Sequence, residues 1–189
     1  MRDWIEDHLL GKVEKPLRYQ GNEMNAVHKD WDSTTLRMVF AFPDVYEIGM
    51  SHLGIQILYD MFNKRKDTYC ERVYSPWVDL DKVLREEQIP LFALESQDPV
   101  KNFDFLGITL QYEMCYPTVL NMLELSNIPL RAADRGEDCP LVIGGGPCSY
   151  NPEPVADFFD LFNIGEGEEV LLEICHLYNK MKEYYNVEK

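Results

Sequence analysis

Three consecutive glycines follow an apolar run in the second half of the chain. Residues 140–143 (PLVI) lead directly into Gly144, Gly145 and Gly146, and Pro147 comes next. Because glycine has no side chain, backbone N–H groups in such a turn can face a phosphate or a flat ring. The segment is neither GxGxxG nor a P-loop, since no GK[ST] follows it. We interpret it as a ligand-facing loop, with a tight turn into a proline-rich loop as the alternative.

The segment from 43 to 54 (PDVYEIGMSHLG) has a similar composition after an earlier apolar run. Gly49 and Gly54 allow the backbone to come close to a ligand or to a sheet. Its polar side chains are Asp44, Tyr46, Glu47, Ser51 and His52. We expect this loop to contribute binding groups. The alternative is a solvated loop before a helix that is capped by Ser51.

Two further segments place polar groups after apolar runs. After the run 105–110 we expect hydrogen-bonding groups over a pocket at Thr109, Gln111, Tyr112 and Glu113. Near the end of the chain, Gly165 and Gly167 bracket Glu166 at the start of a predicted helix. A strand end that meets water explains the first segment equally simply. Acidic capping of a helix N-terminus explains the second.

The sequence predicts neither a catalytic residue nor a metal site. His8, His28 and His176 have no partner at ligand spacing, so we expect surface or core histidines. The acids at 166–169 fit a solvated first helical turn better than a carboxylate metal cluster. The CxxxCxxC motif of a redox iron–sulfur cluster is absent from the 189 residues.

Composition excludes several classes of protein. A hydrophobic fraction of 46% and a charged fraction of 27% are typical of a globular domain. The net charge of −15 argues against a nucleic-acid surface, which needs clustered Lys and Arg. No apolar run has the length of a membrane span, and the first residues do not resemble a secretion signal. Five cysteines without a disulfide framework indicate reduced thiols and a cytoplasmic location.

The elements that must position these loops alternate between strands and helices. Apolar runs predict strands at 36–42, 71–74, 105–110 and 140–143, a last strand within 158–164, and a short strand or extended edge at 91–94. Helical spacing predicts helices at 3–10, 51–64, 79–87, 118–126 and 166–185. Pro117 suits the first turn of the helix at 118–126.

Such alternation is typical of an α/β, doubly wound, mostly parallel five-stranded sheet of the flavodoxin-like or Rossmann-like class. We favour the strand order 2-1-3-4-5, because one five-strand unit fits this length. Ligands of such folds bind at the carboxyl ends of the strands, where all four segments above are expected to lie. We expect residues 1–35 to form an N-terminal arm, 36–175 the α/β domain, and 176–189 a terminal helix and linker.

Seven segments together carry a resemblance to a known family. They are 42–59 (FPDVYEIGMSHLGIQILY), 71–77 (ERVYSPW), 94–96 (LES), 110–113 (LQYE), 144–148 (GGGPC), 151–154 (NPEP) and 164–168 (IGEGE). They resemble the amino-terminal half of an uncharacterised family of radical SAM proteins. The resemblance implies a cobalamin-binding-like domain that precedes a radical SAM barrel. That missing barrel would hold a 4Fe–4S cluster and S-adenosylmethionine, and would be this domain's partner in acting on an unknown substrate.

The resemblance also assigns roles to the loops. Residues 144–146 match the family position along the nucleotide tail, and the loops at 46–54 and 109–113 would face a corrin ring. One motif differs: cobalamin domains that bind cobalt through histidine carry DxHxxG, whereas alignment on His52 puts Met50 and Ile55 at the Asp and Gly positions. The sequence therefore predicts no histidine–cobalt bond. Two alternatives stay open: a degenerate docking domain without corrinoid, and an unrelated nucleotide or phosphate binder.

Overall fold

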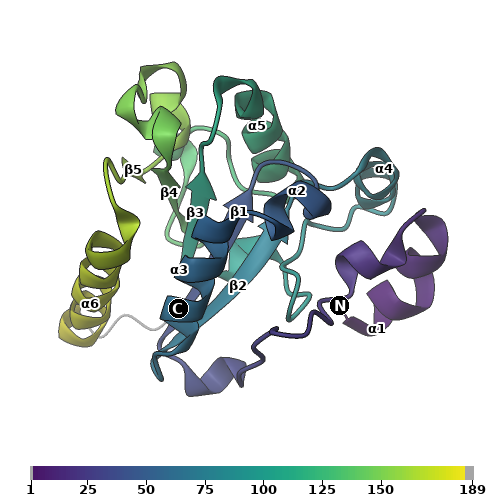
Figure 1. Ribbon diagram of the computed structural model, residues 1–189, viewed down its shortest axis with the longest axis horizontal. Helices are drawn as coiled ribbons and strands as arrows, with labels where there is room; N and C mark the ends of the chain where they lie inside the picture. The colour runs from purple at the N-terminus through teal and green to yellow at the C-terminus, as the bar shows by residue number, and fades with distance from the viewer. Residues whose placement is uncertain (1, 186–189) are drawn as a thin grey trace.

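The computed structural model describes residues 2–185, and its centre is a five-stranded sheet (Figure 1). All strand pairs are parallel, and the spatial order is β2-β1-β3-β4-β5. This confirms the doubly wound class and the order 2-1-3-4-5. The order reverses between β1 and β3, so this fold predicts a ligand site near the carboxyl ends of those two strands.

The strands are β1 (Leu36–Phe42), β2 (Thr68–Tyr74), β3 (Phe105–Thr109), β4 (Leu141–Gly145) and β5 (Leu161–Phe162). Continuous apolar runs form β1 and β3 because both faces of these central strands are covered. The second strand begins three residues earlier than predicted. The last strand lies within the segment 158–164, as predicted, and has two residues, since Glu153–Phe158 forms a 3-10 helix before it. The segment at 91–94 makes only one antiparallel bridge, between Phe92 and Pro99.

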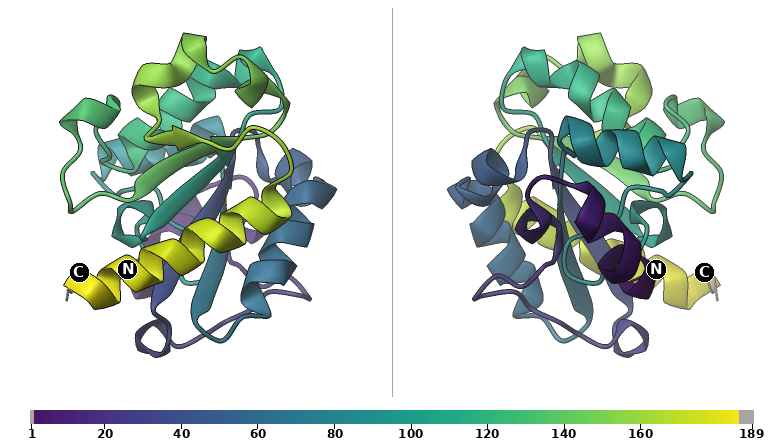
Figure 2. Two further views of the ribbon diagram at one scale, coloured as in Figure 1. Left: turned by 90° about the vertical axis from the view of Figure 1, so that its left-hand side faces the viewer. Right: turned by 90° about the vertical axis from the view of Figure 1, so that its right-hand side faces the viewer.

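Two longer helices cover each face of the sheet (Figure 2). One face carries α3 (Leu53–Asn63) and α6 (Gly167–Tyr185), and the other carries α4 (Val78–Glu86) and α5 (Tyr116–Leu125). The short α2 (Tyr46–Met50) follows β1. As predicted, Pro117 lies in the first turn of α5. Residues 186–189 of the predicted linker lie outside the described residues.

Short 3-10 helices connect these elements. They are Leu10–Lys12, Pro16–Tyr19, Trp31–Ser33, Val100–Asn102, Glu113–Cys115, Ala132–Asp134, Pro147–Tyr150 and Glu153–Phe158. At the N-terminus, α1 (Arg2–Trp4) is followed by a π-helical segment, Ile5–Leu9. The short helix predicted over 3–10 is therefore present as one uninterrupted helical segment, whose type changes from α to π to 3-10 along its length.

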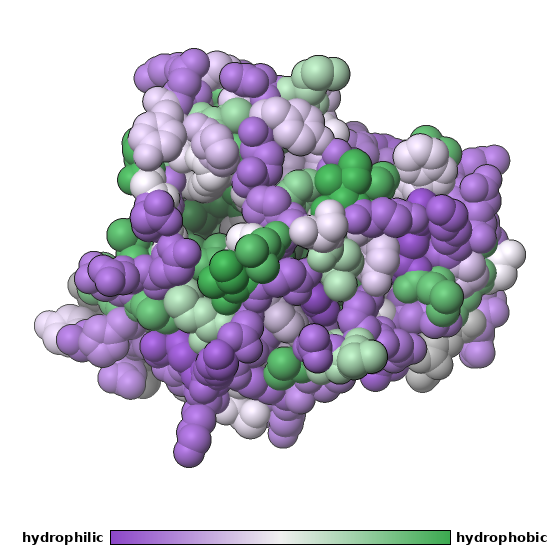
Figure 3. All heavy atoms as spheres, in the orientation of Figure 1, coloured by the Kyte–Doolittle hydropathy of each residue, from purple (hydrophilic) through white to green (hydrophobic). Residues whose placement is uncertain are grey.

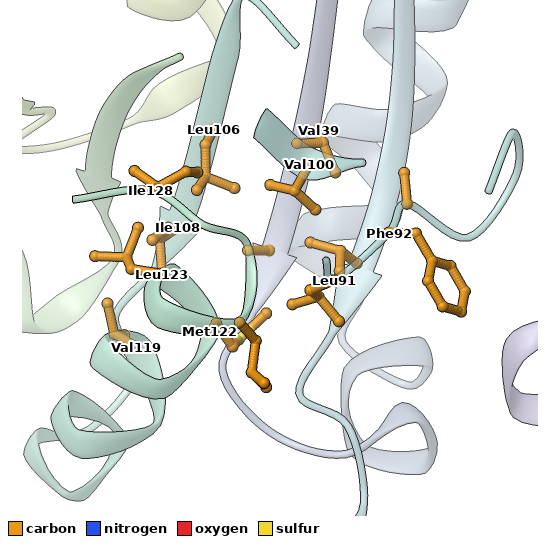
Figure 4. Packing of buried hydrophobic residues seen from close by; sticks show 14 of the residues in the cluster. Val39, Leu91, Phe92, Val100, Leu106, Ile108, Val119, Met122, Leu123 and Ile128 are labelled. Carbon is orange, nitrogen blue, oxygen red and sulfur yellow. The ribbon is translucent and has the colours of Figure 1, made fainter. Parts of the chain in front are cut away.

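The sheet separates two apolar clusters. The larger one lies on the α4 and α5 side, and Figure 4 shows Ile108 of β3 beside Leu123 of α5, and Val39 of β1 beside Val100. It also contains Ile5 and Leu9 of the N-terminal segment, both fully buried. The N-terminal arm therefore packs onto the α/β unit of its own chain. The smaller cluster lies under α3 and α6.

No helix within residues 2–185 is long and apolar enough to cross a membrane. The five cysteines are all free thiols.

Candidate functional site

A pocket of about 200 Å³ opens at the carboxyl ends of the central strands, between α3 and α6. Its floor is the α3 face of the sheet, formed by Phe40 of β1, Gly107 of β3, and Ile143 and Gly145 of β4. One wall is the first turn of α3 and the other is the segment that enters α6. Figure 3 shows a hollow with apolar residues inside it above α3. The pocket thus lies where a doubly wound sheet places its ligands.

The structure brings most of the predicted site residues to this pocket. Its lining includes His52, Gly54, Thr109, Gln111, Gly144, Gly145, Gly146, Gly165, Glu166 and Gly167. They come from the loops after β1, β3, β4 and β5, which lie far apart in the sequence. The predicted convergence of the turns at 49–54 and 144–146 is therefore seen for residues 52–54, but not for Gly49.

The three glycines of the run differ in whether the surrounding structure has room for a side chain. A Cβ on Gly144 would lie 2.6 Å from the ring of Phe162, so packing excludes a side chain there. Gly146 has a φ of +91°, which favours glycine. A Cβ on Gly145 would meet no atom within 4 Å, and its φ is ordinary. The fold does not require glycine at 145, and the space that its missing side chain leaves belongs to the pocket.

His52 caps α3 and lines the pocket. Its Nδ1 accepts the backbone N–H of Ile55 at 3.3 Å, so the neutral ring carries its proton on Nε2. The prediction that Ser51 caps this helix is wrong, because Ser51 ends α2 and its hydroxyl donates to the carbonyl of Ile48. Coordination of a metal through Nε2 needs an unprotonated Nε2 and therefore the loss of this cap. The geometry agrees with the absence of DxHxxG.

Polar groups line one edge of the pocket, and acids line its entrance. Gln111 donates to the hydroxyl of Thr109, and Asn163 donates to the carbonyl of Gly165 at 3.2 Å. Glu166 and Glu168 line the side next to α6. Among the described lining residues there is no Lys or Arg. The electrostatics therefore favour a neutral or cationic group over a phosphate.

The predicted residues Tyr46 and Glu47 face the N-terminal arm and not the pocket. The carboxylate of Glu47 accepts from Arg18 at 2.6 Å and from Lys15 at 3.2 Å, and hydrogen bonding from Arg18 lowers the pKa of Glu47 to about 2. The hydroxyl of Tyr46 donates to Glu23 at 2.9 Å, and its pKa rises to about 12 through burial and this contact. These two residues anchor the arm to α2.

Five other predicted residues lie outside the pocket lining. A Cβ on Gly49 would overlap the ring of Tyr74, so this glycine serves packing. Tyr112 donates to Asp44, which joins the loops after β1 and β3, and this bond raises the pKa of Tyr112 to about 12. The remaining three are Ser51 at the end of α2, and Glu113 and Pro147, each of which begins a 3-10 helix.

Several lining residues were not predicted. They are Phe40, Ile55, Leu58, Gly107, Ile108, Ile143, Asn163, Glu168 and Leu171. Gly107 carried a usable signal, because glycine inside a strand often marks a close approach. Here the group that approaches is the ring of Phe40, 2.9 Å from an added Cβ. The apolar members carried no separate signal, since core positions and pocket floors have the same composition.

Large apolar side chains are exposed on the same loops. They are Ile48, Leu53, Tyr112, Met114, Tyr150 and Ile164, and we call this set the apolar rim. Its members follow β1, β3, β4 and β5, so they belong to the edge of the sheet on which the pocket opens. Contiguous exposed apolar surface is typical of binding sites in soluble proteins. Within the described residues, no group of three or more His, Cys, Asp or Glu is arranged to hold a metal ion.

This chain is similar to known protein sequences. The family model described as "Radical SAM proteins, N-terminal" matches residues 54–189. An uncharacterised protein of Methanocaldococcus jannaschii, MJ0966, is 29% identical over 138 residues. That match covers 71% of this chain but 25% of the relative, so the chain spans about a quarter of the length of this curated relative. No solved structure gives a significant match. Since the family model covers well over half of the chain, the chain belongs to the family of N-terminal domains of radical SAM proteins.

Proposed function

We propose that this domain binds a corrinoid of the cobalamin type for a radical SAM protein, with the aromatic base of the corrinoid tail in the pocket between α3 and α6 and the phosphate of the tail outside it. The observation that carries the proposal is Gly145, which leaves space that the fold itself does not need. A ligand that fills this space gives a reason for glycine at a strand position, where glycine otherwise weakens the strand.

The size and chemistry of the pocket fit one end of a ligand. Pockets that hold a whole small molecule measure about 300–1,000 Å³. A pocket of about 200 Å³ accepts one flat ring system, such as the aromatic base that ends a corrinoid tail. Phe40 and Ile143 give an apolar floor, and Nε2–H of His52 is a donor at the wall. The corrin ring would lie outside the pocket, against the apolar rim.

The residues of this chain would hold and orient the cofactor. The glycine turns admit the tail, the apolar floor excludes water from it, and His52 donates a hydrogen bond without binding cobalt. When bound, a corrinoid supplies a cobalt centre for methyl or radical transfer. In this proposal a radical SAM domain outside these residues binds a 4Fe–4S cluster and S-adenosylmethionine, and carries out the reaction on its substrate.

A second candidate is a docking domain that has no corrinoid. The apolar rim favours it, because the same exposed side chains suit a protein surface as well as a corrin ring. A nucleotide or phosphate site is less well supported. The first turns of α3 and α6 both reach the pocket and would attract an anion, but Glu166 and Glu168 oppose it and no cationic side chain lines the pocket.

The test is retention of corrinoid after desalting. The purified chain is mixed with hydroxocobalamin, desalted, and examined for the visible absorption of the corrinoid. We expect wild type to retain it and Gly145→Val to lose most of it, because valine fills the pocket while suiting a strand. Gly11→Val is the matched control, since its added Cβ also meets no atom within 4 Å but lies in the arm. A wild-type protein without retained corrinoid would favour the docking domain.

A further inference from the structure

A buried arginine on the edge strand reaches the helix that forms one pocket wall. Arg72 of β2 is 2% exposed and does not line the pocket. Its Nε donates to Glu95 Oε1 at 2.7 Å, and its backbone N–H donates to the other oxygen of the same carboxylate at 2.9 Å. A buried ion pair of this kind is a weak source of stability, since desolvation offsets the attraction. Its position therefore needs another reason.

The other end of the guanidinium group contacts the junction between α2 and α3. Nη1 of Arg72 donates to Gln56 Oε1 at 3.2 Å, and the guanidinium carbon lies 4.2 Å from the ring centre of Tyr59. Gln56 Nε2 in turn donates to the backbone carbonyl of Met50 at 3.1 Å. Together Arg72, Gln56 and Met50 form a continuous chain of hydrogen bonds from β2 to the end of α2. We call this chain the Arg72 relay.

The relay ends two residues before the pocket wall. Met50 is the last residue of α2, and His52 caps α3 and lines the pocket. The sulfur of Met50 also accepts from the hydroxyl of Tyr74 at 2.9 Å. The carbonyl and the side chain of Met50 are thus held from the sheet. A change at Met50 would alter the direction in which the chain enters His52.

We propose that Arg72 is a positioning residue for the pocket, which acts through Gln56 and the Met50 carbonyl to fix His52 and the first turn of α3. Arg72 itself touches no ligand in this arrangement. The inference deepens the proposed function, because it concerns the same pocket. It also stands apart from the identity of the ligand, because it rests on hydrogen bonds within the chain.

The N-terminal arm contacts the same guanidinium group. Glu23 Oε2 lies 3.7 Å from Arg72 Nη2, and both atoms are buried without a hydrogen bond. The carboxylate of Glu23 also accepts from Tyr46 of α2 at 2.9 Å. The arm is therefore connected to α2 directly and to the Met50 turn through Arg72. This connection extends the positioning role to Glu23.

The test substitutes Gln56→Met, which removes both hydrogen bonds of the relay, keeps a side chain of similar length, and leaves the direct contact of Arg72 Nη1 with the sulfur of Met50 at 3.5 Å. Asp60→Asn is the matched control, because Asp60 lies on the same helix and pairs only with Lys64 on its exposed side. Backbone amide spectra and thermal unfolding are recorded for both variants without ligand. We expect Gln56→Met to shift the amide signals of residues 50–55 while the midpoint of unfolding stays close to that of wild type. Corrinoid affinity should fall about threefold to tenfold, the effect of one lost hydrogen bond.

The outcomes separate this inference from the proposed function. If wild type binds no corrinoid but Gln56→Met still shifts residues 50–55, the positioning role stands and the corrinoid proposal fails. If Gln56→Met leaves the signals of His52 and Gly54 as they are in wild type, the positioning role is wrong whether or not corrinoid binds. Arg72→Lys is a second variant, since lysine cannot contact Glu95 and Gln56 with the same fork of donors. If it does not fold, Gln56→Met still decides the question.

Discussion

Gly144 and Gly145 are neighbours on β4, and their missing side chains have opposite consequences. A Cβ on Gly144 would overlap Phe162, while a Cβ on Gly145 would enter open space. We expect Gly144→Ala to lower the free energy of unfolding by about 1–3 kcal/mol, the usual cost of overpacking. Gly145→Ala should leave it unchanged or raise it slightly. Urea denaturation followed by circular dichroism measures both variants. Equal losses would contradict the assignment of Gly145 to the pocket.

The sequence predicted this glycine run as a binding loop, but not the separate roles of its members. The role of Gly144 depends on Phe159 and Phe162, which follow β4 in the sequence and pack against it. The residues next to Gly144 in the sequence do not indicate that contact. In the same way, Tyr46 and Glu47 have suitable residue types for a site, but their partners are in the arm, at Glu23 and Arg18. Long-range packing decided which polar residues reached the pocket.

The capping of α3 by His52 leads to a prediction about the free energy of unfolding. We expect His52→Ala to cost about 1 kcal/mol of unfolding free energy, because the N–H of Ile55 loses its acceptor. His52→Asn should cost less, since an asparagine oxygen caps a helix well. Chemical denaturation of the three proteins gives the values. If His52→Ala and His52→Asn are equally stable, the imidazole does not act as a cap.

The raised pKa of Glu71 leads us to expect a free energy of unfolding that depends on pH. Burial, with Glu95 nearby, raises the pKa of Glu71 to about 8, and its Oε1 is buried without a partner. In the unfolded chain the same group ionises near its ordinary pKa, so between the two values only the folded state holds the proton. The contribution of Glu71 to stability is therefore full at acid pH and is lost as the pH rises toward about 8, by at most about 1.4 kcal/mol per pH unit.

The variant Glu71→Gln isolates this effect, because glutamine is neutral at every pH and can still accept the N–H of Ser96. We expect the stability difference between Glu71→Gln and wild type to grow in favour of the variant as the pH rises from about 5 to about 8. Urea denaturation across this range measures the difference, in which other titrating groups largely cancel. A constant difference would show that Glu71 is already ionised in the folded protein.

At the scale of elements, α6 has two apolar faces with different environments. Leu171 and Cys175 are buried against the sheet, while Val170, Leu177 and Met181 are 42%, 59% and 49% exposed. We expect Leu171→Ala to cost about 2–3 kcal/mol, and Leu177→Lys to change the unfolding free energy by less than about 0.5 kcal/mol. Thermal or urea unfolding compares them. A large loss for Leu177→Lys would mean that the outer face is covered in solution.

Element boundaries show where periodicity was informative. The apolar run at 36–42 defined β1 correctly, because a strand covered on both faces is apolar at nearly every position, with Arg37 as the exception. The segment 158–164 is also rich in apolar residues, but Asp160 and Asn163 interrupt it, Phe158 ends a 3-10 helix, and two residues form β5. A short apolar run does not distinguish a strand from the end of a helix. The sheet edge therefore could not be defined from local pattern.

At the scale of the whole molecule, the order of the sheet was predictable, but the course of the arm was not. Alternation of apolar strands and helices leaves few right-handed topologies, and one of them has the observed order. The arm has no such rule, since Ile5, Leu9, Val13 and Tyr19 are separated by polar residues and breaks. Their burial follows from the three-dimensional structure, in which they pack in the larger cluster with residues of α4.

The arm leads to a prediction for the stability of the whole chain. Deletion of residues 2–14 removes Ile5, Leu9 and Val13 from the larger cluster, together with the contacts of Lys12 to Glu87 and of the Glu14 N–H to Asp79. Each buried apolar side chain contributes about 1.5–3 kcal/mol, against about 5–15 kcal/mol for a whole domain. The shortened chain should therefore lose much of its stability and expose apolar surface of α4.

Denaturant unfolding and binding of a hydrophobic dye measure these two effects. Lys12→Ala is the control, because it removes only a solvent-exposed ion pair, whose loss costs less than about 1 kcal/mol. If the shortened chain unfolds at the same denaturant concentration as wild type, the arm does not contribute to the stability of the domain. If it unfolds early while Lys12→Ala does not, the apolar contacts make the arm part of the folding unit.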